Sequence, residues 1–174
     1  MSRVPVVVMG VSGAGKSTVG RRIAESAGRH FIDADDLHPL ASRNKMAAGI
    51  PLTDADRKPW LEAVADAVLV HDGAVVACSA LKRIYREQLR ADLPGLRFVY
   101  LSGDDETIRA RLRARSHEFM PESLLSTQLE TLEPPSGEAD VLELDIRLPI
   151  TELAEASILW LHRLEQNTDA EVRG

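Results

Sequence analysis

Short apolar stretches alternate along this chain with longer stretches in which hydrophobic residues recur every three or four positions. The short stretches are rich in β-branched residues, as expected of strands buried on both faces of a sheet, and the longer ones have the period of amphipathic helices. The predicted strands are Val4–Met9, Phe31–Ile32, Val75–Cys78, Phe98–Leu101 and Val141–Leu144. The predicted helices are Ser17–Ala27, Trp60–His71, Lys82–Ala91, Asp105–Arg115, Pro121–Leu132 and Thr151–Glu165.

This alternation predicts an α/β fold. Right-handed crossovers would build a five-stranded, mostly parallel sheet between two layers of helices. The chain has 174 residues, which lies in the usual range of about 100–200 residues for one domain, so we expect a single domain over residues 1–165. Two further segments are expected, a small helical lid at about residues 111–125 and a polar, flexible tail at residues 166–174.

The composition of the chain argues against several classes of protein, namely those that bind nucleic acid, span a membrane or are secreted. The net charge is −6, from 21 basic and 27 acidic residues, which gives no reason to expect nucleic-acid binding. No apolar run approaches the ~20 residues that a membrane span needs. Met1-Ser2-Arg3 leads directly into an apolar run, without the pattern of a signal peptide. The single Cys78 suits a reducing compartment. We therefore expect a cytoplasmic protein that binds neither nucleic acid nor membrane.

The stretch after the first predicted strand carries the strongest functional signal. It matches G-x-x-x-x-G-K-S/T at every defined position and leads directly into a predicted helix. Glycines let backbone N–H groups turn inward around a phosphate, and a helix N-terminus favours an anion. In this interpretation Lys16 reaches the terminal phosphates of ATP, and Ser17 holds Mg²⁺. The residues predicted to bind the nucleotide are Gly10, Val11, Ser12, Gly13, Ala14, Gly15, Lys16, Ser17 and Thr18.

A GTPase is one alternative class, but its other motifs fail. Asp92-Leu93-Pro94-Gly95 fits D-x-x-G, whereas Asn44-Lys45 lacks the Asp that N-K-x-D requires, because position 47 is Ala47, and it also comes too early in the chain. The strand at Val75–Cys78 lacks the terminal Asp with which many P-loop ATPases hold magnesium. The pattern therefore favours a small-molecule kinase that holds its metal in another way.

Acidic residues at the end of the second predicted strand are the candidates for this role. The carboxyl ends of parallel strands collect ligands, so Asp33 and Asp35 should face the phosphate loop. We predict that Asp33 binds the metal together with Ser17. One of the two carboxylates would orient or deprotonate an acceptor hydroxyl, and the sequence does not divide these duties between them. Helix capping by Asp35 or Asp36 is the structural alternative, and His38 is either a substrate contact or a turn residue.

Four arginines stand at alternate positions of one predicted helix. Arg111 and Arg115 share one face of it, and Arg109 and Arg113 share another. Because a guanidinium binds phosphate oxygens in pairs, we expect Arg111 and Arg115 to neutralise the transferred phosphoryl group from the lid while the other pair faces solvent. A solvated helix face paired with nearby acidic residues is the alternative.

Further stretches together resemble bacterial gluconate kinases. In addition to the phosphate loop, the stretches that carry this resemblance are Phe31–Pro39, Lys45–Leu61, Cys78–Lys82 with Tyr85-Arg86, Phe98–Leu101, Gln128–Leu132 and Asp140–Leu142. The resemblance covers nearly the whole chain except the tail. It implies a fold like those of nucleoside-monophosphate kinases and shikimate kinase, often as a homodimer. It also implies MgATP-dependent phosphorylation of D-gluconate at its 6-hydroxyl, giving 6-phosphogluconate for the pentose phosphate and related pathways.

A pocket for gluconate needs a cation for its carboxylate and polar partners for its hydroxyls, because unpaired buried polar groups are costly. The residues predicted to line it are Asp35, His38, Lys45, Arg57, Lys82 and Arg86, with an exposed helix face as the alternative for Lys82 and Arg86. In similar kinases the adenine lies between a lid arginine and the loop after the last strand, which implies Arg111 and Pro149 here. Another small-acceptor kinase, such as a shikimate kinase, and a non-catalytic nucleotide-binding module stay open as alternatives.

Several polar or reactive residues also have a structural interpretation. Thr53-x-x-Asp56 resembles a helix capping box with Asp in place of Glu, so Asp54 and Asp56 are candidates for a structural role. Trp60 is expected in the core. Cys78 is expected to be a small buried residue and not a nucleophile.

Overall fold

The computed structural model describes residues 3–114 and 122–173 of the chain. Within these residues, five strands form one sheet in the order β2-β3-β1-β4-β5, and every neighbouring pair is parallel. The strands are β1 (Val6–Met9), β2 (Phe31–Asp33), β3 (Val75–Ala77), β4 (Arg97–Ser102) and β5 (Val141–Asp145). The predicted α/β fold is confirmed, and the sheet is entirely parallel.

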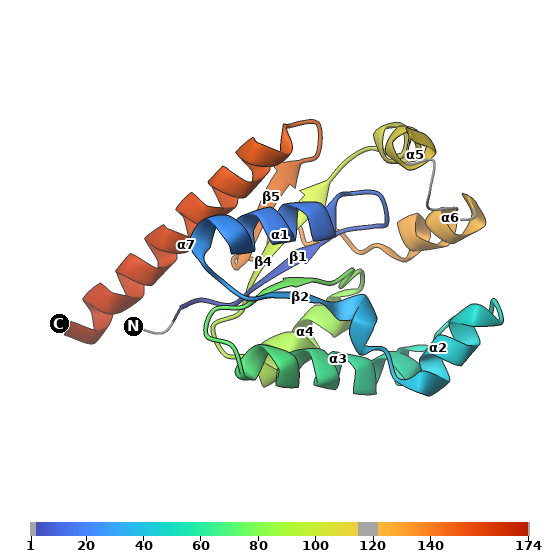
Figure 1. Ribbon diagram of the computed structural model, residues 1–174, viewed down its shortest axis with the longest axis horizontal. Helices are drawn as coiled ribbons and strands as arrows, with labels where there is room; N and C mark the ends of the chain where they lie inside the picture. Colours follow the sequence, from blue (N-terminus) through green and yellow to red (C-terminus); the bar gives the residue numbers. More distant parts are fainter. Residues whose placement is uncertain (1–2, 115–121, 174) are drawn as a thin grey trace.

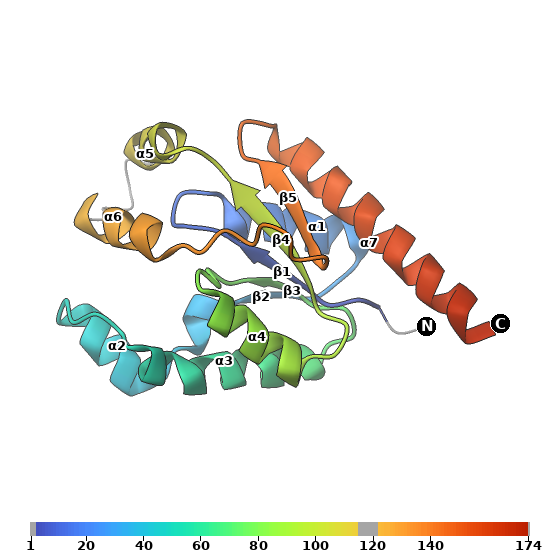
Figure 2. The same ribbon diagram turned by 180° about the vertical axis from the view of Figure 1, so that it is seen from behind.

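Helices cover both faces of the sheet and one of its ends (Figures 1 and 2). One face carries α1 (Lys16–Ala27) and α7 (Ile150–Arg173), and the other carries α3 (Asp54–Leu69) and α4 (Arg83–Asp92). At one end lie α2 (Leu40–Ala47), α5 (Asp105–Ala114) and α6 (Glu122–Thr131). A short 3₁₀ helix, η1 (Ala34–Leu37), follows β2 directly.

The central strand β1 divides the hydrophobic core into two layers. Val7 and Met9 pack in the layer with α3 and α4, whereas Val6 and Val8 pack in the layer with α1. All four side chains are fully buried, because successive residues of a strand point to opposite faces and both faces are covered. Ligand-binding side chains are therefore expected at the carboxyl ends of the strands, in the loops that leave them and in the helices nearby.

The helical segments between β2 and β3 differ from the prediction. Neither η1 nor α2 was predicted, and α3 begins six residues earlier than predicted. The early start has a clear cause: the capping box that Thr53-x-x-Asp56 suggested is confirmed and complete. Thr53 Oγ1 accepts a hydrogen bond from the Asp56 N–H at 3.1 Å, and Asp56 Oδ2 accepts one from the Thr53 N–H at 2.9 Å. Trp60 and Cys78 are buried in the core, as predicted.

The last helix is longer than the sequence suggested. We predicted its end at Glu165, with a separate tail at residues 166–174, but α7 continues to Arg173. The predicted boundary is therefore wrong, and residues 166–173 contain no glycine or proline that would stop a helix. Among the described residues, no helix combines the length and the apolar character that a membrane crossing requires.

Candidate active site

The phosphate loop, residues 10–15, connects β1 to α1. Gly10, Gly13 and Gly15 have φ angles of 149°, 84° and 97°, which residues with a side chain rarely adopt. At Gly13 a Cβ atom would also come within 2.7 Å of Leu112 Cγ on α5. Gly15 is the N-cap of α1 and offers no side-chain oxygen to the first-turn N–H groups. A glycine loop that leads into an uncapped helix N-terminus fits a bound phosphate.

Ser17 and Asp33, the two residues predicted to bind metal, lie side by side. The Ser17 hydroxyl donates a hydrogen bond to Asp33 Oδ2 at 3.1 Å, while Asp33 Oδ1 accepts one from the Asp35 N–H at 3.2 Å. A hydroxyl and a carboxylate beside a phosphate site form the oxygen donor set that Mg²⁺ prefers. Within the described part of the chain, no group of three or more His, Cys, Asp or Glu side chains offers another metal site.

Asp35 stands between charges of both signs. Loss of hydration around its carboxyl raises its pKa, and the negative charge of Asp33 raises it further, while Lys16 and His38 act in the opposite direction. The charges of Asp33, Lys16 and His38 therefore all act on the Asp35 carboxyl. A carboxylate with a raised pKa binds a proton more readily than an ordinary aspartate does.

His38 packs against Trp60 and lies near charged groups of the acidic strand end. Its ring stacks on Trp60 with 4.3 Å between the ring centroids, and burial lowers its pKa, so the imidazole is neutral at physiological pH. Its Nδ1 atom is buried, and no group in the described parts of the chain forms a hydrogen bond with it. Since buried polar atoms are normally paired, this nitrogen is a candidate contact for a ligand hydroxyl.

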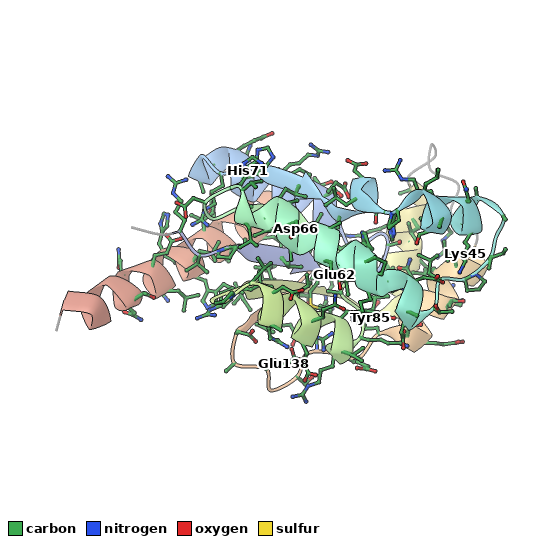
Figure 3. The ribbon with its side chains drawn as sticks, turned by 90° about the horizontal axis from the view of Figure 1, so that it is seen from below. Lys45, Glu62, Asp66, His71, Tyr85 and Glu138 are labelled. Atoms are coloured by element: carbon green, nitrogen blue, oxygen red, sulfur yellow. The ribbon has the colours of Figure 1, made fainter. Side chains whose placement is uncertain are left out.

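A second cluster joins the beginnings of α3 and α4. Asp54 accepts hydrogen bonds from the Tyr85 hydroxyl at 2.5 Å and from Lys82 Nζ at 2.9 Å. Arg57 and Lys82 lie 5.5 and 5.7 Å from the centroid of the Tyr85 ring, and Figure 3 shows Tyr85 on α4 beside the first turns of α3. The positive charge of Arg57 also lowers the pKa of His38, so this cluster lies near the acidic site.

Arg86 does not belong to this cluster, although we predicted that it binds substrate. Its side chain is fully buried, and all five guanidinium N–H groups have partners inside the protein. They donate to the carbonyl oxygens of Ala80, Leu81 and Glu133 and to both carboxylate oxygens of Glu138. We correct the assignment: Arg86 fastens the loop that carries Glu138, seen below α4 in Figure 3, to the rest of the fold.

Lys45 also has a structural partner. Its Nζ atom lies 2.7 Å from Asp56 Oδ1, which ties α2 to the first turn of α3. The Lys45 ammonium, followed by the Thr53 N–H, lowers the pKa of Asp56 to about 2. A direct contact between Lys45 and substrate stays a prediction.

Arg111 lies where the two predicted nucleotide segments meet. It donates a hydrogen bond to the carbonyl of Ile146, in the loop after β5, and a Cβ at Gly15 would stand 3.8 Å from its Nη1 atom. Pro149 is exposed in that same loop. Arg115 lies outside the described residues. Arg109, which we expected to face solvent, donates instead to Ser126 Oγ on α6 at 3.2 Å.

Sequence reasoning missed two contacts at this site. The Tyr85 hydroxyl on Asp54 is one of them. The other is Gln128 Oε1, which accepts a hydrogen bond from the Ser12 N–H of the phosphate loop. Both residues stand in the stretches that resemble gluconate kinases, and that resemblance was the one available signal.

The parallel sheet and the glycine loop at the carboxyl end of β1 define a P-loop kinase. A family model described as "Shikimate kinase" matches residues 12–134. The thermoresistant gluconokinase of Escherichia coli (strain K12) is 45% identical over 157 residues, which cover 87% of this chain and 90% of that protein. The gluconokinase of Gluconobacter oxydans (strain 621H) is 49% identical over 141 residues, 79% of each chain. The crystal structure of a gluconokinase from Sinorhizobium meliloti 1021 aligns with a TM-score of 0.88 at 47% identity, covering 97% of both chains. The chain belongs to the gluconokinase family, within the shikimate-kinase-like group of P-loop kinases.

Proposed function

We propose that this protein transfers the terminal phosphoryl group of ATP to the 6-hydroxyl of D-gluconate, giving 6-phospho-D-gluconate and ADP. One observation carries the proposal. The Ser17–Asp33 pair lies beside the phosphate loop, and the cations Arg57 and Lys82 lie over one tyrosine ring in a second cluster, near enough for the charge of Arg57 to act on His38. Such an arrangement suits a donor phosphate at the loop and an anionic, hydroxyl-rich acceptor at the second cluster. Identities of 45–49% to named gluconokinases support this acceptor.

On the donor side, the chain supplies positive charge and position. The phosphate-loop amides and Lys16 would hold the phosphates of ATP, and Ser17 and Asp33 would hold Mg²⁺. When bound, Mg²⁺ neutralises charge on the phosphate oxygens. Lys16 Nζ donates to the Val11 carbonyl at 3.1 Å, which keeps the ammonium folded over the loop where the phosphates would lie. Arg111 adds a second cation beside the same loop.

On the acceptor side, Asp35 is the residue best placed to orient or deprotonate the 6-hydroxyl. Asp33 is already engaged with the Ser17 hydroxyl, which leaves Asp35 to face the acceptor. Its raised pKa brings the carboxylate closer to the range in which a general base works well. His38 Nδ1 would bind a substrate hydroxyl, and the positive charges of Arg57 and Lys82 would hold the gluconate carboxylate.

A coupled assay of ADP release against a panel of acceptors tests this function. The panel contains D-gluconate, other sugar acids and shikimate, and Lys16→Ala is the control for turnover at the phosphate loop. We expect ADP release that depends on gluconate. Turnover on shikimate instead would favour another small-acceptor kinase, and ATP affinity without any acceptor-stimulated hydrolysis would favour a regulatory module.

The proposal extends to features that rest on the resemblance. They are a homodimer and supply of 6-phosphogluconate to the pentose phosphate pathway. A cytoplasmic location and a single domain with a lid at about residues 111–125, part of which lies outside the described residues, are proposed from the sequence itself. Light scattering after size exclusion tests the homodimer, with twice the 19.1 kDa chain mass as the expected result.

A further inference from the structure

Gln128 makes a contact that the proposed function does not yet use. Its side-chain oxygen accepts a hydrogen bond from the Ser12 N–H at 2.7 Å, although the two residues are 116 positions apart. The Gln128 side chain is half-buried on α6. The contact therefore joins a helix from late in the chain directly to the backbone of the phosphate loop.

Packing and hydrogen bonds fix α6 in this place, so the contact does not depend on a loose side chain alone. Leu125 is 2% exposed, and Leu129 packs against the same core layer as the phosphate-loop residue Val11. Beyond the end of α6, the Glu133 N–H donates to the Leu81 carbonyl at 2.8 Å. Gln128 thus projects from a helix held at its middle and at its end.

The same end of α6 is tied to the acceptor side of the site. Glu133 Oε2 accepts a hydrogen bond from the Arg83 N–H at 2.7 Å, and the Glu133 carbonyl accepts one from Arg86. Arg83 directly follows Lys82, one of the two cations assigned to the gluconate carboxylate. Helix α6 therefore connects two parts of the site. Gln128 on the helix contacts the phosphate loop, and Glu133, just after its end, contacts the turn that carries Lys82.

Two neighbouring amides of the phosphate loop donate to backbone carbonyls and not to side chains. The Ala14 N–H donates to the Val11 carbonyl at 3.1 Å, and the Gly10 N–H donates to the Ser79 carbonyl at 3.4 Å. Of these three described phosphate-loop amides, only that of Ser12 donates to a side chain from a distant element. The Ser12 N–H belongs to the Val11–Ser12 peptide, whose carbonyl accepts hydrogen bonds from the Ala14 N–H and from Lys16 Nζ, so this peptide is held at both its N–H and its carbonyl.

We propose that Gln128 is a positioning residue that sets the Ser12 peptide, and with it the phosphate loop, for the nucleotide. The oxygen of the carboxamide must face Ser12, because the partner there is an N–H donor. Removal of this acceptor leaves the fold of α6 intact but lets the Ser12 peptide rotate, so the loop is no longer preorganised for phosphate. The role towards nucleotide rests on the proposed function, whereas the role towards the Ser12 peptide does not.

The test combines a measurement on the nucleotide-free protein with one on nucleotide binding. Hydrogen exchange of the Ser12 amide, followed by NMR in ¹⁵N-labelled protein, is compared for wild type, Gln128→Met and Gln128→Glu. Met has a similar length but no good acceptor, whereas Glu keeps an acceptor oxygen. We expect faster exchange of Ser12 in Gln128→Met and wild-type protection in Gln128→Glu. Glu130→Gln, an exposed change on the same helix, is the matched control and should exchange as wild type does.

The second measurement is the dissociation constant of ADP by calorimetry, with steady-state kinetics on gluconate. In Gln128→Met we expect ADP to bind about tenfold more weakly, the equivalent of one lost hydrogen bond. We also expect kcat to fall, while the KM for gluconate and the melting temperature stay at the wild-type values. Unchanged Ser12 exchange, or unchanged ADP affinity, in Gln128→Met would overturn the proposal. Both readouts remain valid if gluconate proves not to be the acceptor, so failure of the proposed function is recognised separately.

Discussion

Replacing Arg86 by methionine separates a structural role for this residue from the substrate role that the sequence suggested. Arg86→Met keeps most of the apolar stem but removes five donors at a fully buried position. The carbonyls of Ala80, Leu81 and Glu133 lose a donor, and Glu138 loses one of its two arginine partners. Breaking one side of a buried ion pair costs about 3–5 kcal/mol, and each orphaned carbonyl adds to that cost.

The remaining partner of Glu138 limits this loss. Arg90 also pairs with that carboxylate and with Asp140, so the negative charge does not stay uncompensated. We therefore expect the free energy of unfolding to fall by about 4 kcal/mol, near the middle of the range for a broken buried pair.

Urea unfolding followed by tryptophan fluorescence measures this change. Arg83→Met is the matched control, because its ion pair with Glu87 is exposed and should contribute about 0.5 kcal/mol or less. The KM for gluconate, measured on the folded protein, should not change in either variant. A stability loss below about 1 kcal/mol in Arg86→Met, together with a large rise in that KM, would refute the structural assignment and restore the substrate role.

Three further predictions concern the phosphate loop, the acidic strand end and the helix cap. Lys16→Ala should abolish turnover without lowering the melting temperature, and undiminished activity would contradict the role of this lysine. Asp33→Asn should lower kcat far more than it raises the KM for gluconate. It should also lower the pKa of Asp35, since the charge of Asp33 helps to raise that pKa; an unchanged pKa in an NMR titration would count against this coupling. Asp56 has a folded pKa of about 2 against an ordinary value of 3.8, so its stabilising effect is complete above 3.8 and is lost as the pH falls towards 2. In Asp56→Asn, unfolding free energies measured across this acid range should fall less steeply than in wild type, and an identical slope would disprove the assignment.

The sheet and the phosphate loop could be predicted because their signals are local. A continuous run of valines predicts a strand buried on both faces, and the spacing of Gly10, Gly15 and Lys16 predicts a phosphate loop wherever a strand precedes it and a helix follows. The placement of Asp33 beside Ser17 also followed from a simple rule, that the ends of parallel strands meet at one edge of the sheet.

The hydrogen-bond partners of individual polar and charged side chains could not be predicted in this way. Arg86 looks like any cation on a helix until the fold brings Glu138 to it from 52 positions away. Gln128 likewise finds the Ser12 amide across 116 positions. An arginine or glutamine can form its hydrogen bonds with many partners, and only the tertiary arrangement selects among them. Helix α2 was missed for another reason: of its eight residues only Ser42 is buried, so it has no apolar face to detect.

Phosphorus NMR of the reaction product tests the proposed phosphoryl transfer most directly, because it reports both the acceptor and the position of the new bond. In a mixture of enzyme, ATP, Mg²⁺ and D-gluconate, we expect a new phosphate monoester signal that the two hydrogens on C6 split into a triplet. The signal should be absent with Lys16→Ala. A doublet, which a secondary hydroxyl would give, or a signal of inorganic phosphate alone would contradict transfer to the 6-hydroxyl of gluconate.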